Sequence, residues 1–133
     1  MPLEVVRDER RKWICVRASG SIGIQEILAL IQSARSDVHH RLWPMMFDAT
    51  GATTNATAAD VERVVDSVRD AVRREGAPRG HVALVADDDV LYACMLFYES
   101  RCAEFGVRVI RAFRRLADAE QWLEIVSSAR NFL

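Results

Sequence analysis

The sequence predicts a single α/β domain spanning residues 1–133, with a mixed, mostly parallel five-stranded sheet and about four helices. Short β-rich runs alternate with segments whose apolar residues recur at helical spacing. The first two runs are joined by a polar connection that suits an antiparallel hairpin. A chain of 133 residues is long enough for one core but not for two. Because helices connect the later strands, right-handed crossovers and the order β-β-α-β-α-β-α-β-α are expected.

The first half of the chain predicts a hairpin, a helix and a central strand. Residues 5–7 and 13–16 are the expected hairpin strands. From Ile24 to Ala34 the apolar residues recur every three or four positions, which predicts an amphipathic helix. The apolar run 43–47 then ends in Asp48 and a Thr-Gly turn, which indicates a buried strand that delivers polar groups to the sheet edge.

The second half repeats strand and helix. Thr57 and Asp60 have the spacing of a capping box, and a helix with valines on one face follows them. Gly- and Pro-containing residues 76–80 end this helix, and residues 81–86 are the next expected strand. An acidic triplet at 87–89 precedes the third helix as its cap. A last strand at 107–113, with arginines that suit an edge position, and a last helix at about 118–130, with Asp118 as its expected cap, complete the order.

Composition excludes several classes of function. The net charge of -1 provides no general attraction to polyanions, so we do not expect nucleic-acid binding. No apolar run approaches the roughly 20 residues of a membrane span. The first dozen residues leave no room for a signal peptide, so a cytoplasmic protein is expected. The three widely spaced cysteines predict small core residues rather than a disulfide framework or a zinc site, and no cofactor or metal is expected.

A family resemblance rests on several short segments in a fixed order. These are Gly20, residues 47–51, Val85-Ala86 with Tyr92 and Arg101, residues 109–113, Ala119 and Trp122-Leu123. With them, nearly the whole chain resembles the SpoIIAA-like branch of the STAS proteins, the domain of anti-sigma-factor antagonists and sulfate transporters. That domain shares its topology with the CRAL-TRIO lipid-exchange domain. The resemblance implies a STAS-like fold and a non-enzymatic regulatory or protein-interaction module with a protein partner.

The loop after the central strand is the first candidate site. Phosphorylatable members of the family resemble one another in an Asp-Ser-Ser-Gly-type turn before the second helix, where free N–H groups favour a phosphate. This chain has no serine there, so the resemblance does not assign a phosphoacceptor to one residue. The candidates for partner contact or phosphorylation are Asp48, Thr50, Gly51, Thr53, Thr54 and Thr57.

Asp48 has two further interpretations. It could accept N–H groups in a turn, the interpretation that we favour. The segment 48–51 also resembles the aspartyl-phosphate loop of haloacid-dehalogenase-like phosphotransferases, which would make Asp48 a nucleophile. Those enzymes resemble one another in a lysine downstream of the aspartate, whereas the lysine of this chain, Lys12, precedes it. We therefore expect no enzymatic activity.

The third helix and the last strand hold the remaining candidates. Tyr92, Met95, Phe97 and Tyr98 lie in a helix with few polar residues, which predicts a core helix, a homodimer face or the wall of a pocket for an apolar, lipid-like ligand. The pocket interpretation is the basis of an alternative function, a small carrier. Arg108 and Arg111 are candidates for contact with an anion or for charge protection of an edge strand.

The three histidines predict no site. His39 and His40 are adjacent, so their side chains are expected to point apart, and His81 begins a strand. We expect all three to be surface or capping residues rather than metal ligands or catalytic bases.

Overall fold

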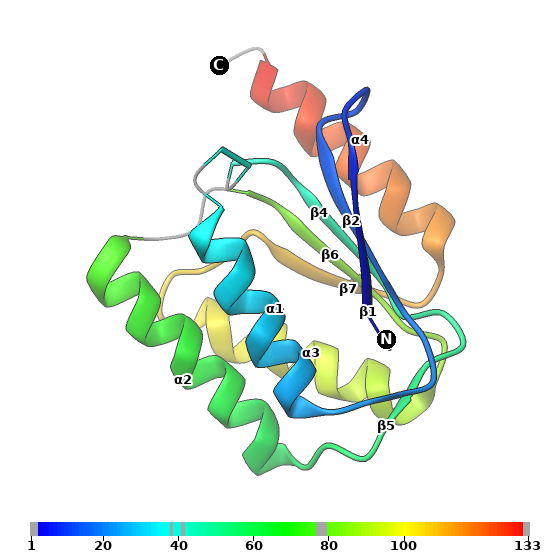
Figure 1. Cartoon of the computed structure of the whole chain (residues 1–133), viewed down its shortest axis with the longest axis vertical. Coiled ribbons are helices and arrows are strands. Elements are labelled where there is room, and N and C mark those ends of the chain that lie inside the picture. The colour runs from blue at the N-terminus through cyan, green and yellow to red at the C-terminus, as the bar shows by residue number, and fades with distance from the viewer. Residues whose placement is uncertain (1–2, 38, 41, 77–79, 132–133) are drawn as a thin grey trace.

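The computed structural model describes residues 3–37, 39–40, 42–76 and 80–131, with the side chains of 35 and 129–131 left out. Seven strands and four helices occur in these ranges (Figure 1). The strands are β1 (Leu3–Asp8), β2 (Trp13–Ala18), β3 (Ser21–Ile22), β4 (Met45–Asp48), β5 (Thr53–Thr54), β6 (Val82–Val85) and β7 (Ile110–Phe113). The helices are α1 (Ile24–Ser36), α2 (Ala58–Glu75), α3 (Asp89–Ala103) and α4 (Leu116–Asn131).

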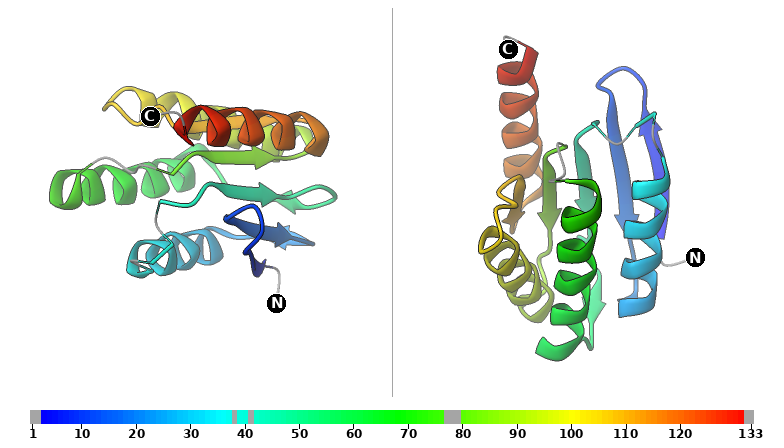
Figure 2. Two further views of the ribbon diagram at one scale, coloured as in Figure 1. Left: turned by 90° about the horizontal axis from the view of Figure 1, so that it is seen from above. Right: turned by 90° about the vertical axis from the view of Figure 1, so that its left-hand side faces the viewer.

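The main sheet has five strands in the order β1-β2-β4-β6-β7. The β1–β2 pair is antiparallel, and each of the three following pairs is parallel. Figure 2 shows the strands side by side from the hairpin through β4 to β6. The predicted fold class and element order are confirmed, and β7 occupies the edge position that its arginines predicted.

Helices cover both faces of this sheet. Helices α1, α2 and α3 contribute to a core cluster with Ile14, Phe47 and Leu84, whereas α4 packs against Met46 and Ala83 on the opposite face. Consecutive strand residues therefore point to opposite faces, as the pleat requires. Figure 1 shows α1 and α2 on one side of the strands and α4 on the other.

Strands β3 and β5 form a second, two-stranded parallel sheet that we did not predict. Thr53 donates its backbone N–H to the Gly20 carbonyl at 2.9 Å, and the Thr54 hydroxyl donates to the Ile22 carbonyl at 2.8 Å. Two-residue strands are too short to show an alternating pattern. This small sheet fixes the beginning of α1 to the loop that precedes α2.

The helix starts match the predicted caps at two places. Thr57 Oγ1 accepts the N–H of Asp60 at 3.2 Å, and the Asp60 carboxylate accepts the N–H of Thr57 at 3.0 Å, so the predicted capping box is confirmed. Asp88 caps α3 by accepting the N–H of Leu91 at 2.9 Å.

Two predicted boundaries are wrong. Helix α4 begins at Leu116, so Asp118 lies in its first turn instead of capping it. The last strand begins at Ile110 rather than at residue 107. Val107 is buried and its N–H bonds the Cys102 carbonyl at 3.1 Å, which keeps this residue in the turn that ends α3.

Candidate functional site

A cavity of about 770 Å³ lies between the sheet and the helices α1, α2 and α3. Its wall is mainly aliphatic and aromatic. The sheet contributes Ile14, Met45, Phe47, Val82, Leu84 and Ile110; α1 contributes Ile24, Ile27, Leu30, Ile31 and Ala34; α2 contributes Val61, Val64, Val68, Ala71 and Val72; α3 contributes Leu91, Cys94, Met95 and Tyr98. The apolar residues that predicted an amphipathic helix at α1 therefore line this cavity.

The cavity follows α1 along its whole length. Gly23 and Ile24 line it at the first turn of the helix, and Asp37 lines it just past the last turn. At this second end the wall includes Leu42, which is 41% exposed, and along the edge strand β1 it includes Val5, which is 45% exposed. The cavity thus reaches the protein surface where the hairpin lies opposite the end of α1.

Two of the four candidates on α3 line the cavity and two do not. Met95 is buried in the wall, and Tyr98 lines it as well. Tyr92 instead lies under the guanidinium of Arg114, with 4.8 Å from Cζ to the ring centroid. Phe97 lies in a shallow groove between α2 and α3. Both residues also pack against the core, so α3 serves as core helix and as pocket wall.

The titratable groups of α3 near the cavity stay uncharged at neutral pH. Burial raises the pKa of the Tyr98 phenol far above its ordinary value and raises the pKa of the neighbouring Cys102 thiol to about 11. Burial also raises the pKa of the Cys94 thiol, which lines the cavity. This part of the wall is therefore an electrically neutral surface.

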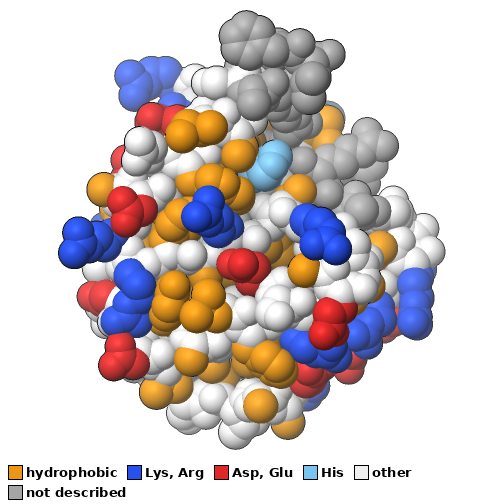
Figure 3. Space-filling model, turned by 180° about the vertical axis from the view of Figure 1, so that it is seen from behind, with side chains coloured by type: hydrophobic (Ala, Val, Ile, Leu, Met, Phe, Trp, Pro, Cys, Tyr) orange, Lys and Arg blue, Asp and Glu red, His pale blue; other side chains and the backbone are white. Residues whose placement is uncertain are grey.

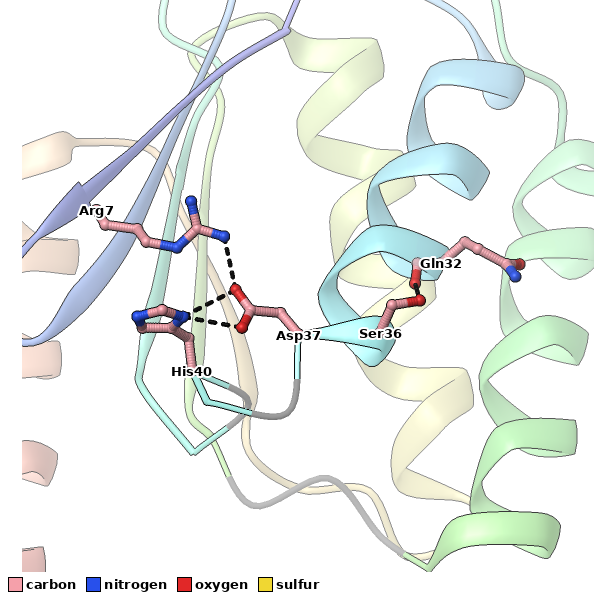
Figure 4. A network of polar contacts seen from close by, with 5 residues as sticks. All are labelled: Arg7, Gln32, Ser36, Asp37 and His40. Atoms are coloured by element: carbon pink, nitrogen blue, oxygen red, sulfur yellow. Dashed lines mark hydrogen bonds and ion pairs between the residues drawn. The ribbon is translucent and has the colours of Figure 1, made fainter.

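The open end of the cavity carries a polar network that we did not predict (Figure 4). Arg7 of β1 donates from Nη2 to Asp37 Oδ2 at 2.6 Å, and His40 Nδ1 lies 2.9 Å from both carboxylate oxygens of Asp37. The hydrogen bonds from Arg7 and then His40 lower the pKa of Asp37 to about 2. All three residues line the cavity, and the His40 ring meets the Trp43 ring edge-on at 4.5 Å.

His40 is partly exposed and bonds Asp37, the residue that caps the end of α1, so its contact with the cavity adds to what we predicted for it. A sequence signal existed, because Asp37 and His40 are three residues apart in a polar turn. Arg7, however, comes from a strand 30 residues earlier, and no local pattern connects it to this turn.

The loop candidates use their polar groups within the loop. Asp48 Oδ1 accepts the backbone N–H of Thr50 at 3.0 Å and its hydroxyl at 2.6 Å. The N–H of Gly51 donates to Asp87 at 2.9 Å, and Gly51 has a φ of +82°, which favours glycine. The turn-forming interpretation of Asp48 is confirmed. Thr50, Thr53 and Thr57 are exposed, and the hydroxyl groups of Thr54 and Thr57 bond the backbone.

The arginine candidates lie on the outer side of the sheet edge. Arg108 and Arg111 are exposed, and the guanidinium of Arg111 lies 5.1 Å from the Phe113 ring centroid. On the same edge strand, the N–H of Ala112 donates to the Glu99 side chain of α3 at 2.7 Å. Figure 3 shows the face that includes α3, β7 and α4, where positive side chains are scattered among acidic and apolar ones. Neither arginine lines the cavity.

In ranges 3–37, 39–40, 42–76 and 80–131, no three His, Cys, Asp or Glu side chains cluster in a way that could hold a metal ion. None of the helices in the described ranges combines the length and the apolar composition that a membrane-spanning segment needs.

The comparisons with known proteins identify the fold class. No family model matches the chain, and no curated protein matches it. Among solved structures, the chain is similar to an uncharacterized protein from the DUF3478 family with a SpoIIAA-like fold from Shewanella loihica PV-4. The two are 14% identical, the TM-score is 0.52, and the match covers 91% of each chain. The protein has a SpoIIAA-like α/β fold, which agrees with the resemblance found in the sequence.

Proposed function

We propose that this protein is a small, non-enzymatic binding module that holds one apolar or amphipathic ligand between its sheet and helices α1, α2 and α3. The single observation that carries the proposal is the cavity of about 770 Å³. Protein interiors are ordinarily packed with few voids larger than a water molecule. Ligand pockets, in contrast, have volumes of roughly 300–1,000 Å³ and mainly apolar walls with a few polar groups. The cavity matches the second description.

The chemistry of the wall supports ligand retention rather than a reaction. The part of the wall supplied by α3 stays neutral, because burial keeps Tyr98 protonated and raises the pKa of Cys94. The charged pair at the open end, Arg7 and Asp37, neutralises itself, and the wall also includes the exposed Glu75 at the end of α2. Asp48, the candidate nucleophile, accepts two hydrogen bonds from Thr50 in a turn and does not line the cavity.

Titration with the neutral fluorescent probe N-phenyl-1-naphthylamine tests the proposal. We expect saturable binding with a blue-shifted emission, because the probe enters an apolar environment. Ala71→Phe places a ring inside the cavity and is expected to weaken binding by about ten-fold or more, which corresponds to about 1.4 kcal/mol. Ala117→Phe, at an exposed position of α4 across the sheet, is the matched control and should bind like the wild type.

The unmodified protein gives a second test. Native mass spectrometry after purification without denaturation should reveal a reproducible non-covalent mass that Ala71→Phe loses. If the wild-type protein carries no ligand and binds no probe, the proposal is wrong.

A regulatory or protein-interaction module is the second candidate function. The observation that favours it is a shallow apolar groove of about 400 Å³, beside the start of α2, whose wall includes Ala58, Val90 and Phe97. Val90 is 55% exposed. The groove adjoins the end of the loop 48–57, so one partner could contact both.

Substitutions in the groove and the loop test this candidate. Phe97→Glu and Thr53→Ala should each reduce the recovery of a specific partner, whereas Ile125→Glu, at an exposed site on α4, should not. The hypothesis fails if every recovered partner stays bound to both variants. The same native mass spectra would show whether the partner is a second copy of this chain.

A further inference from the structure

The length of the cavity defines the length of the ligand. The cavity lining extends from Ile24 at the start of α1 to Asp37 after its end. A helix of 13 residues is about 20 Å long, at about 1.5 Å per residue. An extended alkyl chain advances about 1.25 Å per carbon, since each C–C bond is about 1.5 Å long and the bond angle is about 111°. About 16 carbons therefore span the cavity.

The volume of the cavity is sufficient for a chain of this length. The space of about 770 Å³ lies within the range of roughly 300–1,000 Å³ that ligand pockets have. The cavity therefore accommodates at least one alkyl chain of about 16 carbons together with its head group.

The two ends of the cavity differ in what they offer to a polar head. At the end near Ile24, the polar side chains bond the local backbone: Asp60 accepts the N–H of Thr57, and Thr54 donates to a carbonyl. At the open end, the contacts with Asp37 employ Nη2 of Arg7 and Nδ1 of His40. A guanidinium has five N–H donors, and an imidazole has a second ring nitrogen. Spare donors and access to solvent thus coincide at the open end.

We infer that the ligand is an amphiphile with an alkyl chain of about 16 carbons, whose oxygen-bearing head lies beside Arg7 and His40 and whose methyl end lies near Ile24. This inference rests on the proposed function and adds the ligand class and its direction. The head contacts groups that keep hydrogen-bonding capacity, and the chain covers the apolar faces of α1, α2 and the sheet.

Displacement of bound N-phenyl-1-naphthylamine by saturated n-alkyl carboxylates tests the inferred chain length of the ligand. Each probe carboxylate, from 8 to 20 carbons, is used below the concentration at which it aggregates. We expect affinity to rise about four-fold per added methylene up to about 16 carbons, because each one buries further apolar area. Beyond about 18 carbons no further gain is expected. An optimum near 8 to 10 carbons, or a gain that continues to 20, would overturn the inference.

Trp43 allows the direction of the bound chain in the cavity to be measured, because it lines the cavity at the end where Arg7 lies. Trp13 and Trp122 belong to the core on the other face of the sheet. Bromine quenches tryptophan at short range, so 2-bromohexadecanoate should quench Trp43 more strongly than 16-bromohexadecanoate. The Trp43→Phe variant supplies the background from the other two tryptophans. Stronger quenching by the 16-bromo chain, or equal quenching by both, contradicts the proposed direction.

Head-group variants separate this inference from the proposed function. Arg7→Gln should weaken hexadecanoate binding several-fold while probe affinity stays within about two-fold, and Arg7→Lys should restore part of the loss. If the probe binds but no alkyl chain displaces it, the ligand class is wrong and the cavity still functions. If the probe itself does not bind, both proposals fail.

Discussion

Replacement of Ala71 by leucine should stabilise the fold if a cavity lies beside α2, and should destabilise the fold if that space is already packed. Ala71 is 8% exposed on α2 and lines the cavity. Leucine adds three carbons, which contribute up to about 2.4 kcal/mol at about 0.8 kcal/mol each. Ordering the longer side chain costs about 0.5–1 kcal/mol. The net expectation is a stabilisation of about 1.5–2 kcal/mol.

The corresponding change in melting temperature is large enough to measure. A domain of 133 residues has an unfolding entropy of about 0.28 kcal/mol/K, so Tm should rise by about 5–7 °C. Ala119→Leu is the matched control, because Ala119 is also a buried helix alanine, but it packs tightly between α4 and the sheet. There an added side chain should cost about 1–3 kcal/mol and lower Tm by about 4–11 °C.

Differential scanning calorimetry of the ligand-free protein measures both variants. Delipidation on a hydrophobic resin comes first, since a bound ligand would itself stabilise the wild type. A fall in Tm for Ala71→Leu comparable to that for Ala119→Leu would show that the space beside α2 is closed in solution. The cavity-based proposals would then lose their foundation.

Three further predictions concern the cap, the polar network and the cysteines. Thr57→Ala should cost about 1 kcal/mol and lower Tm by about 3–4 °C in the same calorimeter, because it removes the acceptor of the capping box, whereas Thr57→Ser should retain most of the stability. The pKa of Asp37 is about 2 in the folded state, lowered from 3.8. Its pairing therefore stabilises the fold above pH 3.8, and this contribution is lost as the pH falls toward 2. In urea unfolding between pH 2 and 7, the stability difference between wild type and Arg7→Gln should therefore shrink on acidification. A bound ligand should slow alkylation of Cys94, because Cys94 lines the cavity. It should not slow alkylation of Cys15, which packs on the other face of the sheet. Mass spectrometry of labelled peptides measures both rates.

Each of these outcomes can be contradicted by one result. Equal Tm values for Thr57→Ala and wild type would show that another group replaces the cap. A pH-independent difference for Arg7→Gln would remove the Asp37 ion pair from the stability of the fold. Equal protection of both cysteines would indicate general stabilisation rather than occupation of the cavity.

The sequence was sufficient for the order of the elements, because hydrophobic periodicity and turn residues are local signals. The valine face of α2 and its Thr57 cap were predicted and are present in the structure. The arginines of β7 identified an edge strand. The strands β3 and β5 were missed because each contains two residues, and the start of β7 was placed early because residues 107–109 are also β-rich.

The cavity could not be predicted in the same way. Periodicity predicts that Ile27 and Val68 point inward, but it does not predict whether the opposite wall closes against them. Whether it closes depends on the distance between α1 and the sheet. The β3–β5 pair sets this distance at one end of α1, and the Arg7–Asp37 contact sets it at the other. Both contacts join residues about 30 positions apart. Such pairings are properties of the folded chain rather than of any sequence window.

The contact between Glu99 and Ala112 has a consequence for self-association. An exposed sheet edge is a template on which another chain can add a strand. At β7 the Glu99 carboxylate already occupies a hydrogen-bonding position that a sixth strand would need, and displacing it would leave a half-buried charge without that partner. Strand addition is disfavoured at this edge, so any assembly of copies of this chain there would have to use helix surfaces, where side chains rather than backbone groups determine which partner fits.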